Sequence, residues 1–335
     1  MFQVYNPSGR FSPLALVLMP IAAIAVVALS YVYQLGLYWI PLIYVNFLLT
    51  WCMGMAIGKA GEFVIVAGHV RNVAVSIFLL AILVVLGLGA KFGFQYIHAR
   101  IAFAEQLSQW TQQELGVDAD RQLDRDELER IRKVILADYT FLRHIEDRVA
   151  SGWHIGRGAK APVSGPIVYL VWITELGIIV YFGGTVILEA ARRPYSEKLG
   201  RWANSVTNEM SLPITNPVMV AKISTAKSVQ DLLTLPIPDT DESDKVAVYQ
   251  VHSVPNASDE DAYLSVDLQT YSRNAKGEIE VAHEYLVKLA IITAAERAQL
   301  KENAELMQEA LEAYRASLAN RPTEPEATDE EPEQA

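Results

Sequence analysis

The chain has 335 residues and a formal net charge of −11, from 39 Asp and Glu against 28 Lys and Arg. Nucleic-acid phosphates are bound by clustered Lys and Arg, so an acidic chain without such clusters is expected to have no nucleic-acid partner. The single cysteine excludes an intrachain disulfide and a zinc site built from cysteines.

Charged side chains are almost absent from the first 95 residues, where apolar runs of about 20 residues are long enough to cross a bilayer. Three such runs lie there, and a fourth follows later: 14–33, 37–57, 73–92 and 166–190. Only Gln34, Leu35 and Gly36 separate the first two runs, which predicts a tight antiparallel hairpin. We therefore expect an α-helical multi-pass membrane anchor of about four transmembrane helices, with the lipid bilayer as its first partner.

Positive charges in the short loops predict the orientation. Arg10 precedes the first run, Lys59 and Arg71 bracket the loop between the second and third, and Arg192 follows the fourth. Under the positive-inside rule, both termini lie in the cytoplasm of what we expect to be a bacterial inner (plasma) membrane. Lys91, at the other end of the third run, disagrees with this orientation.

Two pairs of glycines stand four residues apart near the ends of the runs, Gly54 with Gly58 and Gly89 with Gly93. This spacing lets helix backbones approach closely. We expect the glycines to serve packing within the bundle rather than a dimer interface.

Glu175 lies near the middle of the fourth run, where an ionisable side chain is costly and usually faces the bundle interior. In a structural role it is protonated and hydrogen-bonded to Asn46, Thr50 or Tyr44 of the second run. In a functional role it carries a proton or binds a cation. The structural role is favoured, because no Lys, Arg or His is expected deep in the other runs to act as its partner.

Residues 96–165 are expected to form an extracytoplasmic amphipathic helical hairpin followed by a Gly-rich loop. Apolar residues recur at roughly helical spacing up to Gly116, and again over 124–149 with an interruption at Asp138. The apolar faces would pack on each other or on the membrane surface.

The segment that joins the two helices resembles the later part of an EF-hand calcium loop. Asp118, Asp120 and Glu127 match the third, fifth and twelfth positions of that loop, where oxygen ligands are typical. The chain departs from the family at Gly116, where a carboxylate is usual, and at Arg121, where glycine is usual. Capping of the following helix explains the same acidic residues, so we expect no stable calcium site.

Residues 191–320 are expected to form a small cytoplasmic α+β region. The residue spacing in its first segment resembles that of a zinc knuckle, although Ser196 and Leu199 replace the two cysteines. Without thiolates we expect no zinc site. Alternating β-rich runs at 246–254, 262–271 and 279–292 predict an antiparallel meander. Such a small sheet needs support from a partner, a second copy or the segment 218–235.

A last helix is predicted from Thr293, where Glu296 completes a capping box, and its apolar residues keep a heptad-like spacing up to Leu318. The sequence leaves two packing modes for this helix: docking on the sheet or forming a coiled coil. The acidic tail, 321–335, has almost nothing apolar to bury and is expected to be disordered.

No catalytic motif is present, since the six histidines show no metal-ligand spacing and no nucleophile elbow occurs. We expect a protein that is not an enzyme and holds no cofactor. The first hypothesis is an anchor or scaffold for protein–protein interaction, with a protein partner or a second copy of the chain. The alternative is a subunit of a transporter or channel that uses Glu175.

Overall fold

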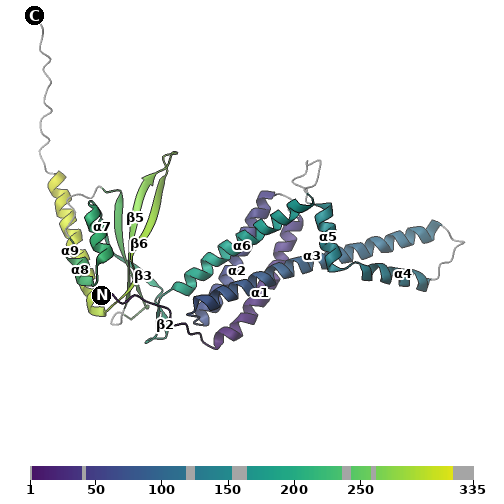
Figure 1. Ribbon diagram of the computed structural model, residues 1–335, viewed down its shortest axis with the longest axis horizontal. Helices are drawn as coiled ribbons and strands as arrows, with labels where there is room; N and C mark the ends of the chain where they lie inside the picture. Colours follow the sequence, from purple (N-terminus) through teal and green to yellow (C-terminus); the bar gives the residue numbers. More distant parts are fainter. Residues whose placement is uncertain are drawn as a thin grey trace, which may run out of the picture. The chain divides into compact units, whose positions relative to one another are not determined.

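The structure is a computed structural model, in which two compact units are described separately (Figure 1). Pro7–Arg192 form a helical unit, and Arg193–Ala335 join Met1–Asn6 in a second unit that contains a sheet. The residues described are 2–39, 43–117, 125–152, 164–235, 243–257 and 262–319.

Four helices of the first unit are long and apolar enough to cross a membrane, in agreement with the four runs in the sequence. Short helices α4 and α5 lie between the third and fourth of them. The bounds are α1 Leu14–Trp39, α2 Ile43–Ala67, α3 Val73–Val117, α4 Arg125–Asp138, α5 Phe141–Ser151 and α6 Pro166–Arg192.

The turn expected at 34–36 is wrong, because α1 continues to Trp39. Nothing in that stretch breaks a helix, and the lack of a side chain at Gly36 leaves room for Leu49 of α2. Helix α2 also extends further than predicted, to Ala67. Its charged residues Lys59 and Glu62 pair with each other one turn apart, at 2.6 Å.

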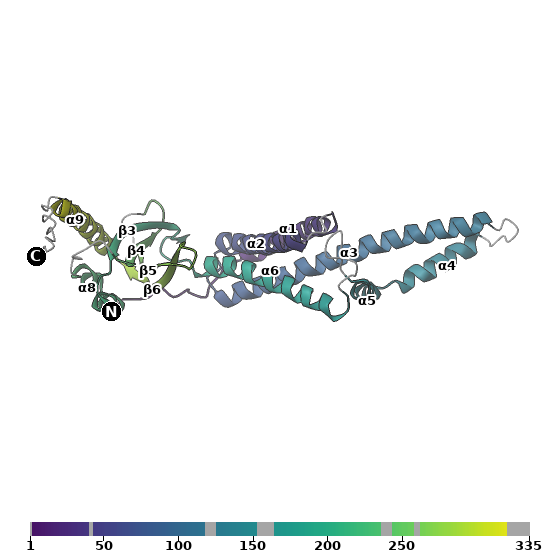
Figure 2. The ribbon, with the colours of Figure 1, turned by 90° about the horizontal axis from the view of Figure 1, so that it is seen from above.

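The break expected after residue 92 is also wrong, because α3 is one continuous helix of 45 residues. No proline interrupts it, so the apolar run continues directly into the amphipathic stretch. Helix α4 runs back alongside the outer part of α3, which gives the expected hairpin (Figure 2). The single second helix expected over 124–149 is divided in two, since Thr140 accepts a hydrogen bond from the Arg143 backbone N–H and caps α5.

Glycines bring α2 and α6 into backbone contact. A Cβ atom on Gly58 would lie 2.9 Å from Cβ of Val186 and 3.1 Å from Cα of Gly183. Packing within the bundle, as predicted for the first glycine pair, is thereby confirmed. A Cβ atom on Gly89 or Gly93 would meet nothing within 4 Å, so this prediction fails for the second pair.

The second unit is built on an antiparallel sheet of order β3-β4-β5-β6. The three predicted strands are confirmed as β4, β5 and β6, and edge strand β3 was not predicted. Two further short strands, β1 and β2, pair in a separate hairpin. The bounds are β1 Tyr195–Ser196, β2 Arg201–Trp202, β3 Ser205–Pro213, β4 Lys245–Ser253, β5 Ala262–Arg273 and β6 Ile279–Ile292.

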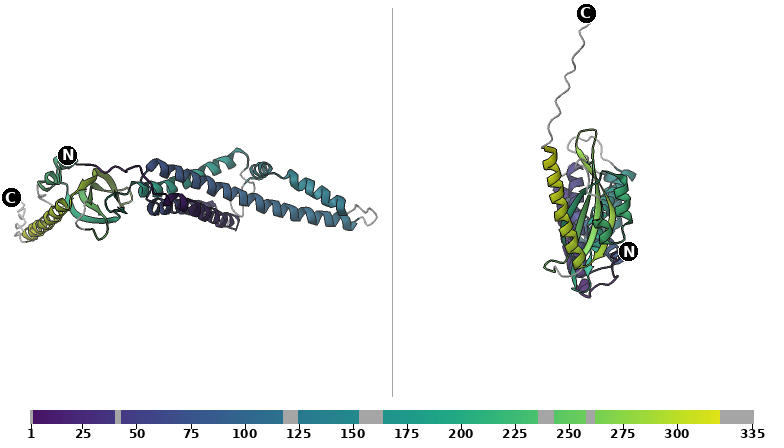
Figure 3. Two further views of the ribbon diagram at one scale, coloured as in Figure 1. Left: turned by 90° about the horizontal axis from the view of Figure 1, so that it is seen from below. Right: turned by 90° about the vertical axis from the view of Figure 1, so that its left-hand side faces the viewer.

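Three helices cover the sheet through one apolar core (Figure 3). They are α7 Pro217–Thr225, α8 Val229–Leu233 and α9 Ala294–Ala319. Helices α7 and α8 lie in the segment 218–235, one of the supports proposed for the sheet. The heptad-like residues Leu300, Ala304 and Met307 of α9 face this core, so this part of α9 docks on its own sheet.

The N-terminal residues belong to the sheet unit. The Tyr5 backbone N–H donates to the Leu289 carbonyl at 2.9 Å, and the Ile291 N–H donates to the Gln3 carbonyl at 2.8 Å, beside an isolated bridge between Val4 and Ala290. The segment that precedes α1 therefore folds with the segment that follows α6. If the helices cross a membrane, an even number of crossings returns the chain to the side from which it started, and four helices satisfy this condition.

Candidate functional site

Glu175 is the centre of a hydrogen-bond network to which all four long helices contribute. Both of its carboxylate oxygens contact the Lys91 ammonium of α3, with Nζ–Oε2 at 2.6 Å. The Tyr33 hydroxyl of α1 donates to Oε1 at 2.7 Å and lies 2.9 Å from the Thr50 hydroxyl of α2. Glu175 is thus held by an ion pair.

The expectation that no Lys, Arg or His lies beside Glu175 is therefore wrong. Thr50 reaches it only through Tyr33, and Tyr44 is 85% exposed and has no part in the network. The missed partner is Lys91, which is only 2% exposed. Because α3 continues past residue 92, Lys91 lies in the interior of a continuous helix and not at a helix end.

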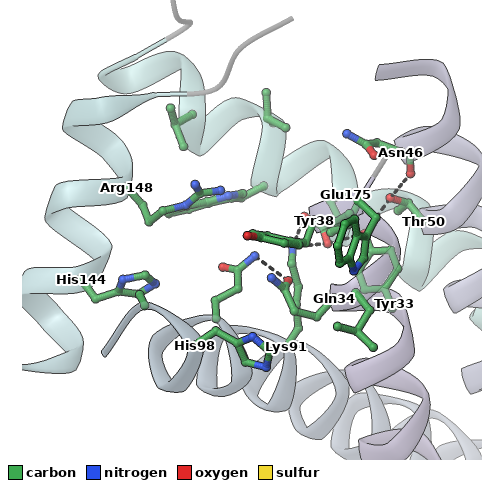
Figure 4. Close-up of a pocket in the computed structure, with 18 of the residues that line it drawn as sticks. Tyr33, Gln34, Tyr38, Asn46, Thr50, Lys91, His98, His144, Arg148 and Glu175 are labelled. Atoms are coloured by element: carbon green, nitrogen blue, oxygen red, sulfur yellow. Dashed lines mark hydrogen bonds and ion pairs between the residues drawn. The ribbon is translucent and has the colours of Figure 1, made fainter. Parts of the chain in front are cut away.

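Next to this network lies a cavity of about 880 Å³. Side chains from α1, α2, α3, α5 and α6 line it, and Figure 4 shows Arg148 and His144 reaching toward the residues around Glu175. The polar lining consists of Tyr33, Gln34, Tyr38, Asn46, Thr50, Lys91, Gln95, His98, Glu105, His144, Arg148, Thr174 and Glu175. A volume of this size is typical of small-molecule sites.

Two buried polar atoms of the lining residues have no hydrogen-bond partner among the residues that the structure describes. They are Oδ1 of Asn46, whose residue is 4% exposed, and Nε2 of His144, whose residue is 3% exposed. An unsatisfied buried polar group costs about 1–3 kcal/mol. Asn46 was singled out from the sequence as an intramembrane polar residue, and the structure places it in the same cavity wall as Glu175.

The surroundings of His144 favour its neutral form. Its Nδ1 lies 3.0 Å from the Tyr139 hydroxyl, and burial together with the nearby Arg148 charge lowers its pKa below the ordinary histidine value. The Arg148 guanidinium, one turn further along α5, forms no ion pair with any described residue. Sequence reasoning did not single out Arg148, since an arginine on an amphipathic helix usually faces water.

The candidate calcium loop is not brought into this site. Asp118 and Asp120 lie outside the described residues, and Glu127 lies in the first turns of α4. Within the described ranges, no group of three or more His, Cys, Asp or Glu side chains is placed to hold a metal ion.

The segment whose spacing resembles a zinc knuckle forms the β1–β2 hairpin. At its turn, Gly200 adopts φ +63° and donates its N–H to the Ser196 carbonyl at 2.8 Å. The Ser196 side-chain oxygen accepts the Leu199 N–H at 3.2 Å, and the Tyr195 and Trp202 rings pack edge to face. Hydrogen bonds and ring packing therefore hold this turn.

Comparison of the chain with known protein families, with curated proteins and with solved structures found no match.

Proposed function

We propose that the four-helix bundle is a membrane-embedded ligand-binding unit and that the cavity beside Glu175 is its binding site. The observation that carries this proposal is the cavity itself, which combines a large apolar lining with a few convergent polar groups. The unsatisfied Asn46 and His144 atoms support it, because a polar ligand that reached them would remove the cost of burying them.

In this proposal the four helices cross a bacterial inner (plasma) membrane, and both termini lie in the cytoplasm. The cavity extends from Glu175 toward the outer part of α3 and toward α5, and so lies at the extracytoplasmic end of the bundle. The sheet unit follows α6 on the cytoplasmic side. The chain then anchors a cytoplasmic unit to a bundle that binds its ligand from the other side.

Native mass spectrometry of the full chain, purified in a mild detergent, tests the proposal. We expect a small molecule to copurify with the wild type and to be lost from Ala99→Phe, because Ala99 lines the cavity and the larger ring would fill it. Ala81→Phe is the matched control, since Ala81 is exposed on the same helix and does not line the cavity. Equal occupancy in the two variants, or an empty wild type, would contradict the proposal.

A second candidate function is transport through the same bundle, favoured by the buried Lys91–Glu175 pair. In this case Glu175 exchanges a proton or cation while Lys91 compensates its charge. Flux measured in reconstituted vesicles should then fall in Glu175→Gln. An unchanged flux would leave Glu175 with a purely structural role.

The sheet unit offers an interaction surface for the anchor or scaffold hypothesis. Apolar side chains are exposed on β5 and β6, with Tyr271 39%, Ile279 66% and Tyr285 55% exposed. We propose that a protein partner or a second copy of the chain binds there. Crosslinking of the detergent-solubilised protein should give a discrete adduct that Ile279→Lys abolishes, whereas a strict monomer that captures no protein would count against this role.

A further inference from the structure

We infer that the ligand of the cavity is an amphiphile with one anionic headgroup, which Arg148 binds while the apolar chain lies along α1 and α6. This inference rests on the proposed ligand-binding function and adds the chemical class of the ligand. It follows from the balance of charges in the cavity, from the free histidine nitrogen and from the apolar wall.

The charge of Arg148 is the one that a ligand can compensate. Lys91 is already paired with Glu175, so neither needs a ligand charge. Arg148 pairs with no carboxylate in the described part of the chain, and the neighbouring undescribed segment 153–163 contains no Asp or Glu. Glu105 and Arg148 both line the cavity and both are exposed, but no ion pair joins them in the described part of the chain.

His144 supplies a second group suited to an anion. It precedes Arg148 by four residues on α5, so both side chains lie on the same helix face. When the Tyr139 hydroxyl donates to Nδ1, the neutral ring carries its proton on Nε2. This nitrogen is buried and has no partner among the described residues, and it can then donate to a headgroup oxygen beside the guanidinium.

The apolar wall distinguishes an amphiphile from a small free anion. Tyr38, Trp39 and Leu170 line the cavity, and they are 73%, 74% and 62% exposed. In a membrane these side chains face lipid, so a hydrocarbon chain can enter between them without crossing water. A free phosphate or acetate would leave this wall without a ligand contact.

The experiment uses quenching of tryptophan fluorescence by brominated stearate, added to the full chain in a neutral maltoside detergent. Trp39 and Trp172 line the cavity and report contact with bromine. The comparison compounds are the brominated alcohol and the brominated trimethylammonium of equal chain length. An alkyl phosphate, inorganic phosphate and acetate are added as competitors, so that a lipid-like anion is distinguished from a free one.

We expect saturable quenching by the carboxylate and competition by the alkyl phosphate, but none by inorganic phosphate or acetate. Arg148→Gln should weaken carboxylate binding at least about tenfold and leave alcohol binding unchanged. Arg148→Lys keeps the positive charge and should keep most of the carboxylate affinity. Arg143→Gln is the matched control, because Arg143 lies on α5, does not line the cavity and pairs with Asp138.

Tighter binding of the trimethylammonium compound, or an unchanged carboxylate affinity in Arg148→Gln, would overturn the inference and leave the cavity as a binding site for another class of ligand. Competition by inorganic phosphate would replace the amphiphile with a small anion. If no compound gives saturable quenching and Ala99→Phe changes nothing, the proposed function fails together with the inference.

Discussion

The pair formed by Lys91 and Glu175 joins α3 to α6, and the two side chains are only 3% and 11% exposed. A buried ion pair gains little over a well-packed apolar pair, yet the loss of one partner leaves the other charge uncompensated. Tyr33 and Thr50 extend the pair to α1 and α2, so that one network positions all four helices. The effects of mutating Lys91 and Glu175 should therefore not be additive.

We expect Lys91→Met to lower the free energy of unfolding by about 3 kcal/mol, because Glu175 would remain buried without its cation. The double variant Lys91→Met/Glu175→Gln should recover a large part of this loss. Lys59→Met is the control, since Lys59 forms an exposed pair with Glu62 and should change stability by less than about 1 kcal/mol. Denaturant titrations in detergent measure all three, and additive losses in the double variant would show that the pair is not coupled.

Protonation of His144 should loosen α5. Its folded pKa is lower than the ordinary value of about 6.5, because burial and Arg148 disfavour the charged ring while Asp147 opposes them weakly. The unfolded chain then takes up the proton first, so the contribution of His144 is complete above about pH 6.5 and is lost as the pH falls through the folded pKa.

Hydrogen exchange of α5 amides, corrected for intrinsic rates, measures this effect. Exchange should accelerate at about pH 5.5 in the wild type relative to neutral pH, and His144→Phe should remove most of the acceleration. The same acceleration in His144→Phe would assign the pH dependence to another group.

Sequence reasoning found one half of the ion pair and missed the other. Glu175 stood out because a carboxylate interrupts an apolar run, whereas Lys91 stood one residue before the expected end of the third run and was counted only as a charge at that end. Which lysine faces which glutamate depends on the rotation of two helices that are far apart in the sequence. Arg148 and Tyr33 were missed for the same reason, since both become polar cavity walls only after α5 and α1 are packed.

At the scale of elements, the crossing of α2 and α6 depends on residues without side chains. Gly58→Ala should destabilise the bundle by about 1–3 kcal/mol, because its Cβ atom would be forced against Val186 and the Gly183 backbone. Gly89→Ala is the matched control, since it has open space around it and should be neutral or stabilising by up to about 1 kcal/mol. Thermal unfolding in detergent compares them, and equal effects would show that the spacing does not matter.

Helix identity was predictable from apolar runs, but helix ends were not. The predicted helix ends at 34–36 and after 92 were the limits of apolar runs. The sequence contains no proline or charge cluster there to end a helix, and α1 and α3 continue past both positions. The strands β4, β5 and β6 were found because their apolar residues alternate. Strand β3 was missed because it is a half-exposed edge strand with few apolar residues that ends at Pro213, a residue that sheets tolerate at their edges.

At the scale of the whole molecule, the contact between the N-terminal segment and β6 constrains the path of the chain. Nothing in the sequence of residues 2–6 indicates a strand, because the segment gains its partner only from a region almost 300 residues away. Once formed, this pairing requires that the start of α1 and the end of α6 lie on the same side of the membrane. It therefore supports the even number of crossings that hydropathy suggested, independently of charge.

The path can be tested with single cysteines in a Cys52→Ser background. Asn6→Cys and Ser272→Cys lie in the sheet unit, and Gln109→Cys lies on the outer part of α3, all at exposed positions. With a membrane-impermeant maleimide added to spheroplasts, we expect labelling at Gln109→Cys alone, and labelling at the other two only after lysis, because the positive-inside rule predicts that Arg10 and Arg192 lie on the cytoplasmic side. The reverse pattern would invert the orientation but preserve four crossings. Different accessibility of Asn6→Cys and Ser272→Cys would contradict the pairing of the N-terminal segment with β6, and with it the even number of crossings.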